Sequence, residues 1–171
     1  LDTGSTDGTQ AKVLELLGPN GELHEEPFVD YGTTRNRVMD IATAAEKTGK
    51  PPVFLFMMSA DETLYHPEAL RKFAEEHRNS VGHMHEAYPL PMDVGWKFDI
   101  LRLSRTDSHW RYVGKVHEYL AAPDGMGRDS IRIPDAFIKF TVTDPERRAD
   151  REKMIARILE KCIHALFRFL I

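Results

Sequence analysis

The sequence contains little cysteine, no long apolar run and no excess of basic residues. Its single cysteine, Cys162, cannot form an internal disulfide. It lies in a helical apolar pattern, so we interpret it as a core residue, which fits a reducing compartment and favours the cytoplasm. Because no apolar run is long enough to cross a bilayer, we expect no membrane span in this chain.

Acidic residues outnumber basic ones by 27 to 23, and the formal net charge is −4. This balance disfavours nucleic-acid binding, which needs clustered Lys and Arg along a phosphate backbone. A negatively charged protein can still bind an anionic nucleotide where a metal ion or a local arginine supplies positive charge. The 171 residues, 42% hydrophobic and 29% charged, are typical of one soluble domain with its own core.

Helical and extended patterns alternate along the first half of the chain. Residues 53–58 are six apolar residues in succession, which predicts a strand buried on both faces. Apolar residues at helical spacing predict a short helix after Gly8 and longer helices over residues 33–47 and 67–78. This alternation predicts an α/β fold whose Rossmann-type sheet is mostly parallel and flanked by helices.

The second half of the chain carries a different pattern. Polar and apolar residues alternate over residues 81–88 and 98–103, which predicts two further strands that we expect to be antiparallel. A final helix is predicted over residues 144–171. Leu1 and Asp2 resemble the end of a strand, so we expect the chain to be a fragment that lacks a first strand and helix.

Acidic residues follow two of the predicted strands. Asp2 and Asp7 lie in a turn after the first, and Asp61 and Glu62 follow the strand at 53–58. Ligands of open α/β sheets bind beyond the carboxyl ends of the strands, so we expect both acidic groups to line one crevice. Carboxylates suit Mg²⁺ or Mn²⁺, and such an ion would neutralise a diphosphate and stabilise it as a leaving group.

Four segments with distinctive residues follow one another along the first 120 residues. They are Asp-Thr-Gly-Ser-Thr-Asp-Gly-Thr at 2–9, Asp-Tyr-Gly-Thr-Thr-Arg-Asn at 30–36, Ser-Ala-Asp-Glu at 59–62 and Tyr-Val-Gly-Lys-Val-His-Glu at 112–118. In this order they resemble motifs of the family 2 glycosyltransferases, which have the GT-A fold. The resemblance implies inverting, metal-dependent transfer of a sugar from a nucleotide-sugar donor to a hydroxyl of a carbohydrate, lipid or protein acceptor.

The resemblance also implies how the chain is divided and what residues on the donor side do. It implies one domain over residues 1–171, with a nucleotide-sugar-binding half at 1–64, an acceptor-side half at 65–143 and the helix at 144–171. The roles it implies on the donor side are base or ribose binding by Asp2, shaping of the nucleotide pocket by Asp7, phosphate contact by Arg35, orientation of that arginine by Asn36, and binding of Mn²⁺ or Mg²⁺ by Asp61.

On the acceptor side, the resemblance makes Glu118 the candidate base that deprotonates the acceptor hydroxyl. His117 would bind metal or position Glu118. We also consider that an acceptor sugar stacks on Trp110. Ser59 stands where the metal motif has its first acid, so we expect a reduced metal affinity, and residues 138–140 offer no late histidine ligand.

Two alternative functions remain open. Ser59 and the missing first strand favour a catalytically decayed relative that binds nucleotides or serves as a scaffold. The string Leu-Asp-Thr-Gly-Ser-Thr at 1–6 matches the active-site string of pepsin-like aspartic proteases, where two Asp share a proton. No second Asp-Thr-Gly or Asp-Ser-Gly supplies a partner carboxylate, and a helical pattern follows the turn, so the protease is the remote alternative. Taken singly, Asp2 and Asp7 are also ordinary turn residues.

Overall fold

The computed structural model describes residues 1–45, 53–79, 87–125 and 130–140, together with Lys153. Most of the strand predicted over 81–88 and nearly all of the helix predicted over 144–171 lie outside these residues. Among the residues described, no helix combines the length and the apolar character needed to cross a membrane.

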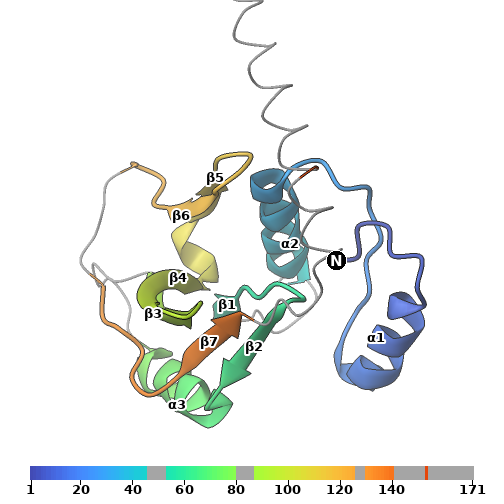
Figure 1. Ribbon diagram of the computed structural model, residues 1–171. Coiled ribbons are helices and arrows are strands. Elements are labelled where there is room, and N and C mark those ends of the chain that lie inside the picture. The colour runs from blue at the N-terminus through green and yellow to red at the C-terminus, as the bar shows by residue number, and fades with distance from the viewer. Residues whose placement is uncertain (46–52, 80–86, 126–129, 141–152, 154–171) are drawn as a thin grey trace, which may run out of the picture.

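A five-stranded sheet forms the centre of the structure, with the strand order β1-β4-β3-β7-β2 (Figure 1). Its strands are β1 (Phe54–Phe56), β2 (Glu62–Tyr65), β3 (Ala87–Asp93), β4 (Lys97–Arg105) and β7 (Phe137–Phe140). The neighbouring pairs are antiparallel except for β3 and β7, which are parallel. A second, antiparallel sheet consists of β5 (Arg111–Val113) and β6 (Tyr119–Ala121).

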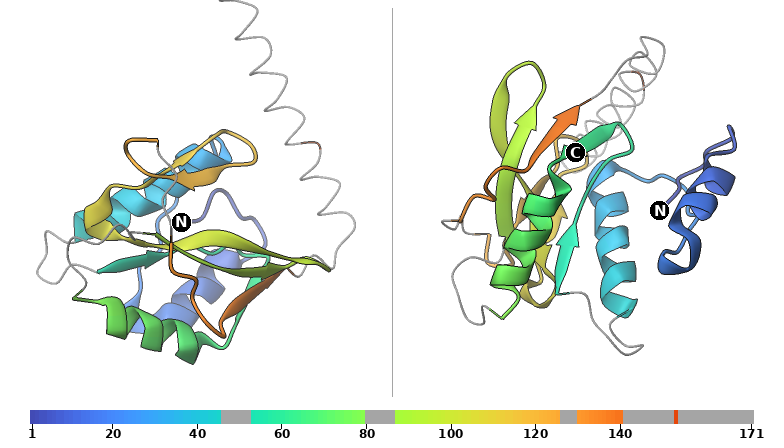
Figure 2. Two further views of the ribbon diagram at one scale, coloured as in Figure 1. Left: turned by 90° about the vertical axis from the view of Figure 1, so that its left-hand side faces the viewer. Right: turned by 90° about the horizontal axis from the view of Figure 1, so that it is seen from below.

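Hydrophobic cores cover both faces of the five-stranded sheet. Helix α3 (Pro67–His77) covers one face, and this α3-side core consists of Leu70, Phe73, Tyr88, Leu90, Met92, Leu103, Ile133, Ala136 and Ile138. Helix α2 (Tyr31–Ala45) and the β5–β6 sheet cover the other face, and this α2-side core consists of Met39, Ala87, Trp110, Tyr112, Leu120 and Ala122. Figure 2 shows α3 below the sheet and α2 with β5 and β6 above it.

The prediction of a mostly parallel, Rossmann-type sheet flanked by helices is wrong. Strand β1 pairs antiparallel with β4 at one edge of the described sheet. Phe54 and Phe56 pack against the α3-side core, whereas Leu55 and Met57 pack against the α2-side core. An edge strand that is covered on both faces is therefore as apolar as a central parallel strand, and its apolar run does not reveal the direction of its neighbour.

The helices and the second-half strands agree better with the sequence patterns. The helix predicted over 67–78 is α3, and the one predicted over 33–47 is α2, which begins two residues earlier, at Tyr31. The short helix after Gly8 is α1 (Thr9–Leu17). The strand predicted over 98–103 lies within β4, which pairs antiparallel with β3, whereas β3 shares only its first two residues with the strand predicted over 81–88.

The N-terminal segment lies beside α2 and apart from the five-stranded sheet (Figure 1). No residue of α1 is buried. Asp2 pairs with Glu25 through a single parallel bridge, outside the five-stranded sheet. The expectation that Asp2 and Asp61 follow parallel strands of one sheet is therefore wrong, because the strand before Asp61 is β1, whose partner is β4.

Candidate functional site

The first turn of α2 fixes the position of the residues that follow it. Asp30 is buried, and its carboxylate accepts a 2.7 Å hydrogen bond from the backbone N–H of Thr33, which caps the helix. Gly32 lies against the backbone of Gly114, so closely that a Cβ atom at position 32 would be 2.2 Å from the Gly114 carbonyl oxygen. The segment 30–36 is thereby held against the start of the 114–118 segment.

Asn36 joins α2 to β5 by two hydrogen bonds. Its amide nitrogen donates to the carbonyl oxygen of Tyr112 at 2.9 Å, and its amide oxygen accepts from the backbone N–H of Tyr112 at 2.8 Å. The side-chain amide thus pairs with the backbone of β5 as a neighbouring strand would. From the sequence, we expect Asn36 to orient Arg35. In the structure, both described hydrogen bonds of the Asn36 side chain go to the backbone of Tyr112 in β5.

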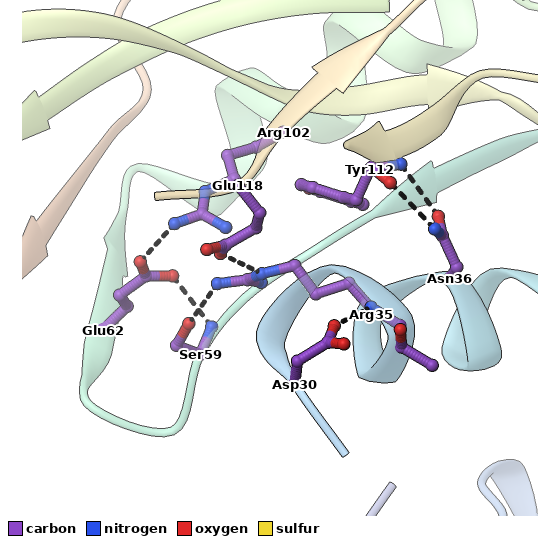
Figure 3. A network of polar contacts seen from close by, with 9 residues as sticks. Asp30, Arg35, Asn36, Ser59, Glu62, Arg102, Tyr112 and Glu118 are labelled. Atoms are coloured by element: carbon purple, nitrogen blue, oxygen red, sulfur yellow. Dashed lines mark hydrogen bonds and ion pairs between the residues drawn. The ribbon is translucent and has the colours of Figure 1, made fainter. Parts of the chain in front are cut away.

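Arg35 lies at the centre of a cluster of charged and polar side chains (Figure 3). Its Nε donates to Glu118 Oε1 at 2.7 Å and its Nη2 donates to Ser59 Oγ at 2.9 Å. The side chains of Arg35 and Glu118 are 13% and 14% exposed, so the ion pair is mostly withdrawn from water but still reachable. The guanidinium carbon is 5.3 Å from the centre of the Tyr112 ring, within cation–π range.

A second ion pair lies deeper in the same cluster. Arg102 of β4 donates from Nη2 to Glu62 Oε1 at 2.5 Å, and the two side chains are 6% and 3% exposed. Glu62 Oε2 accepts a 2.8 Å bond from the backbone N–H of Ser59, which fixes the turn between β1 and β2. Two arginines and two glutamates thus balance one another, with Ser59 between the two pairs.

Neither Arg102 nor Tyr112 was assigned a role from the sequence. The available signal was a cation between two apolar residues in a predicted strand, since Arg102 lies between Leu101 and Leu103 and a buried cation needs a counter-ion. Burial raises the pKa of the Tyr112 phenol, and the positive charges of Arg102 and Arg35 oppose this shift.

Asp2 and Asp7 each form hydrogen bonds within the N-terminal turn. The Asp2 carboxylate accepts bonds from the Ser5 hydroxyl, the backbone N–H groups of Gly4 and Ser5, and the Gln10 side chain. The bond from the Ser5 hydroxyl is the main cause that lowers the pKa of Asp2. Asp7 Oδ1 accepts bonds from the backbone N–H and hydroxyl of Thr9. These bonds stabilise the N-terminal turn, so both carboxylates have a structural role there.

Asp61 is half-buried in the turn between β1 and β2, next to the cluster. Within the described ranges, no group of three or more His, Cys, Asp and Glu side chains is arranged to hold a metal ion. The neighbouring Glu62 is committed to Arg102 and to the Ser59 backbone. A divalent cation bound by Asp61 would therefore take its other ligands from outside the described side chains, such as phosphate oxygens and water, a mode that Mg²⁺ accepts.

The remaining predicted residues lie in contrasting surroundings. His117 is exposed and adopts a left-handed backbone conformation, with φ of 56°, immediately before Glu118. Trp110 is 5% exposed and belongs to the α2-side core. The suggestion that a sugar stacks on Trp110 is therefore wrong, because its ring is used for packing and has no open face.

Comparison of the chain with protein-family models and with curated proteins finds no match. The inference of function depends instead on what the structure brings together. Residues from three of the four motif segments meet in one cluster: Arg35, Ser59 and Glu118 are joined by hydrogen bonds across 24 and 83 positions of sequence. The segment at 2–9 forms its own turn.

Proposed function

We propose that this protein is a glycosyltransferase that moves a sugar from a nucleotide-diphosphate donor to an acceptor hydroxyl, with inversion and with Mn²⁺ or Mg²⁺. The observation that carries the proposal is the contact of Arg35 with both Glu118 and Ser59. It joins a cation suited to phosphate, a carboxylate suited to proton transfer and the turn that holds Asp61. A transfer from a diphosphate donor needs these three functions close together.

Arg35 is the proposed phosphate contact. An arginine carries five N–H donors, and the described contacts of Arg35 use one on Nε and one on Nη2. The remaining donors are available to phosphate oxygens, for which the planar guanidinium is well suited. Glu118 and Ser59 hold the guanidinium in place before the donor arrives, so little side-chain freedom is lost on binding.

Glu118 is the proposed base. Its Oε1 accepts the bond from Arg35 and orients the carboxylate, while its Oε2 accepts no hydrogen bond from the residues described. In the proposed step, Glu118 takes the proton of the acceptor hydroxyl as that oxygen forms a bond to the anomeric carbon of the donor sugar. The bond from this carbon to the diphosphate breaks, and the nucleoside diphosphate leaves with the electron pair.

Asp61 is the proposed protein ligand of the divalent cation, which would neutralise charge on the departing diphosphate when bound. The experiment that tests this assignment is a thermal-shift screen of nucleoside diphosphates and nucleotide sugars, with and without Mn²⁺. We expect a nucleotide to raise the melting temperature of the protein only with Mn²⁺ present, and Asp61→Ala to remove that rise. Asp99→Ala is the matched control, since Asp99 is an exposed carboxylate paired with Arg132.

An unchanged metal-dependent shift in the Asp61→Ala variant would reject the metal assignment. The other candidate function, a decayed relative that binds nucleotides without transfer, is favoured by Ser59, whose hydroxyl is already committed to Arg35. Metal-dependent nucleotide binding with no release of sugar from any donor, in a folded sample, would select this second function.

A further inference from the structure

The five-stranded sheet has a stretch of open surface on the same side as α2. Side chains alternate between the two faces of a strand, so Leu64 and Ile138, which pack in the α3-side core, place Tyr65 and Phe137 on the opposite face. Toward β4 this face is covered by the α2-side core. At β2 this face carries Tyr65, which is 40% exposed.

A stack of side chains crosses this open surface. The rings of Tyr65 and Phe137, which are opposite each other in the β2–β7 register, are 4.7 Å apart and 6° from parallel. Lys97 Nζ lies 5.3 Å from the centre of the Phe137 ring. Phe137 is thus contacted by Tyr65, by Lys97 and by the His66 ring, whose centre is 6.0 Å away, whereas Tyr65 belongs to β2, the last strand of the described sheet. Within the described sheet, no further strand lies beyond Tyr65.

The groups that surround Tyr65 are polar. Thr63 and Lys139 are exposed and opposite each other in the same register, one step along the strands. His66, 59% exposed, follows Tyr65 in a left-handed conformation and lies 3.2 Å from Glu68. A protein or membrane partner would need a broader apolar surface than this single ring.

We propose that Tyr65 is a stacking platform for a sugar ring of the acceptor, which makes the acceptor a carbohydrate. This inference rests on the proposed function. A pyranose has a face of weakly positive C–H groups, which suits the negative face of an aromatic ring, and an edge of hydroxyls, which suits Thr63, His66 and Lys139. Thr63 and Lys139 are one step along the same face of the sheet, and the centre of the His66 ring is 6.0 Å from that of Phe137, so all three can reach hydroxyls at the edge of a stacked sugar.

The position of Tyr65 relative to the polar cluster agrees with this assignment. Arg35 belongs to α2 and Glu118 precedes β6, so both belong to the layer that covers the α2 side of the sheet. By strand alternation Tyr65 lies on that same side, which carries α2 and the β5–β6 sheet in Figure 2. An acceptor chain stacked on Tyr65 would therefore lie on the side of the sheet from which Glu118 is presented.

The experiment measures the binding of neutral oligosaccharides, namely maltohexaose, cellohexaose and chitohexaose, to the full chain by saturation-transfer NMR and calorimetry, without any nucleotide. We expect at least one to bind at millimolar concentration. Tyr65→Ala should weaken that binding by about tenfold, whereas Tyr65→Phe, which keeps the ring, should change it by no more than about threefold. Tyr119→Ala is the matched control, because Tyr119 is 62% exposed on β6.

Nucleotide binding in the thermal-shift screen separates this inference from the proposed function. Each nucleotide should shift the melting temperature equally in Tyr65→Ala and in the parent chain. If no nucleotide binds the parent chain, neither protein should show a shift. The inference is overturned if no oligosaccharide binds a folded sample, if Tyr65→Ala binds as tightly as the parent chain, or if Tyr65→Ala loses nucleotide in place of sugar. The last result would make the ring a base-stacking residue.

Discussion

At the scale of single residues, Gly32 lies where the neighbouring backbone leaves no room for a side chain. It lies in the first turn of α2, where alanine is ordinarily favoured over glycine by about 1 kcal/mol. Here a Cβ atom would be 2.2 Å from the carbonyl oxygen of Gly114, well inside contact distance. Backbone atoms cannot move aside as a flexible side chain would, so the segments 30–36 and 112–118 would have to separate.

We therefore predict that Gly32→Ala lowers the free energy of unfolding by about 1–3 kcal/mol, the usual cost of forcing extra atoms into a packed site. Urea unfolding followed by circular dichroism measures the change. Thr33→Ala, at an exposed position of the same turn, is the control and should have little effect. A Gly32→Ala variant as stable as Thr33→Ala would contradict the close approach of the two backbones.

Tyr112 gives a pH dependence whose direction follows from its environment. Burial raises the pKa of its phenol above the ordinary value of about 10. A group whose pKa is higher in the folded state contributes stability below its unfolded pKa, and this stability is lost as the pH rises through the folded pKa. The protein should therefore lose stability in strongly alkaline solution as Tyr112 is forced to ionise.

Ultraviolet absorbance of tyrosinate during an alkaline titration measures this effect. The chain has five tyrosines, of which Tyr88 is buried as well as Tyr112, so the Tyr112 step is the part of the late absorbance change that Tyr112→Phe removes. That late change should be smaller by one tyrosine in Tyr112→Phe and undiminished in Tyr119→Phe. A late change of full size in Tyr112→Phe would contradict the raised pKa of Tyr112.

At the scale of elements, the side chain of Asn36 joins α2 to β5 by two hydrogen bonds of the kind that a neighbouring strand would form. Removal of the Asn36 amide leaves the N–H and C=O groups of Tyr112 without their partner. We predict that Asn36→Ala lowers the free energy of unfolding by about 2 kcal/mol, the sum of two hydrogen bonds of ordinary strength. Hydrogen exchange at the Tyr112 amide should also quicken.

Asn36→Asp separates the two bonds. It keeps an oxygen that can accept from the Tyr112 N–H but loses the donor to the Tyr112 carbonyl. Its stability should therefore lie between those of the parent chain and Asn36→Ala. Equal stability of all three proteins would show that the amide bonds contribute nothing to holding β5 against α2.

Elements that depend on residues close together in the sequence could be predicted from it. Strand pairings between residues far apart in the sequence could not. Helices α2 and α3 follow from apolar spacing with nearby caps and prolines, and β4 follows from the alternation of polar and apolar residues. The same alternation placed the preceding strand at 81–88, whereas β3 extends to Asp93. The partner of β1 is β4, some 50 residues away in the register Phe54↔Arg105, and no local pattern encodes it. The error in fold class comes from this pairing and from the expected N-terminal strand, which lies outside the five-stranded sheet.

The same division applies to the candidate site. Arg35, Ser59 and Glu118 were predicted from their motifs, and the structure joins them by hydrogen bonds. The buried pair of Glu62 and Arg102 was not predicted, because the two residues are 40 positions apart and each is ordinary within its own strand. The exposed ring of Tyr65 was also missed, since its exposure depends on the edge position of β2.

For the molecule as a whole, the polar cluster adds hydrogen bonds to the apolar contact between the sheet and the layer that carries α2. Arg35 belongs to α2, Ser59 to the turn before β2, and Glu118 to the segment before β6. The hydrogen bonds of this cluster therefore join the two layers in addition to the α2-side core (Figure 3). In the proposed function, this junction holds the donor phosphates and the acceptor hydroxyl between the two layers.

This arrangement predicts different kinetic effects for the two partners of the ion pair. Glu118→Gln keeps an oxygen that accepts from Arg35 but cannot take a proton, so sugar transfer should fall by about 100-fold or more while nucleotide binding stays close to normal. Arg35→Gln removes the phosphate contact and also releases Glu118, so both nucleotide affinity and turnover should fall. Arg37→Gln is the matched control, because Arg37 lies on the same helix in an exposed pair with Glu26. Transfer by Glu118→Gln at the parent rate would remove Glu118 as the base, and equal losses in Arg35→Gln and Arg37→Gln would mean that general positive charge, and not the cluster, attracts the donor.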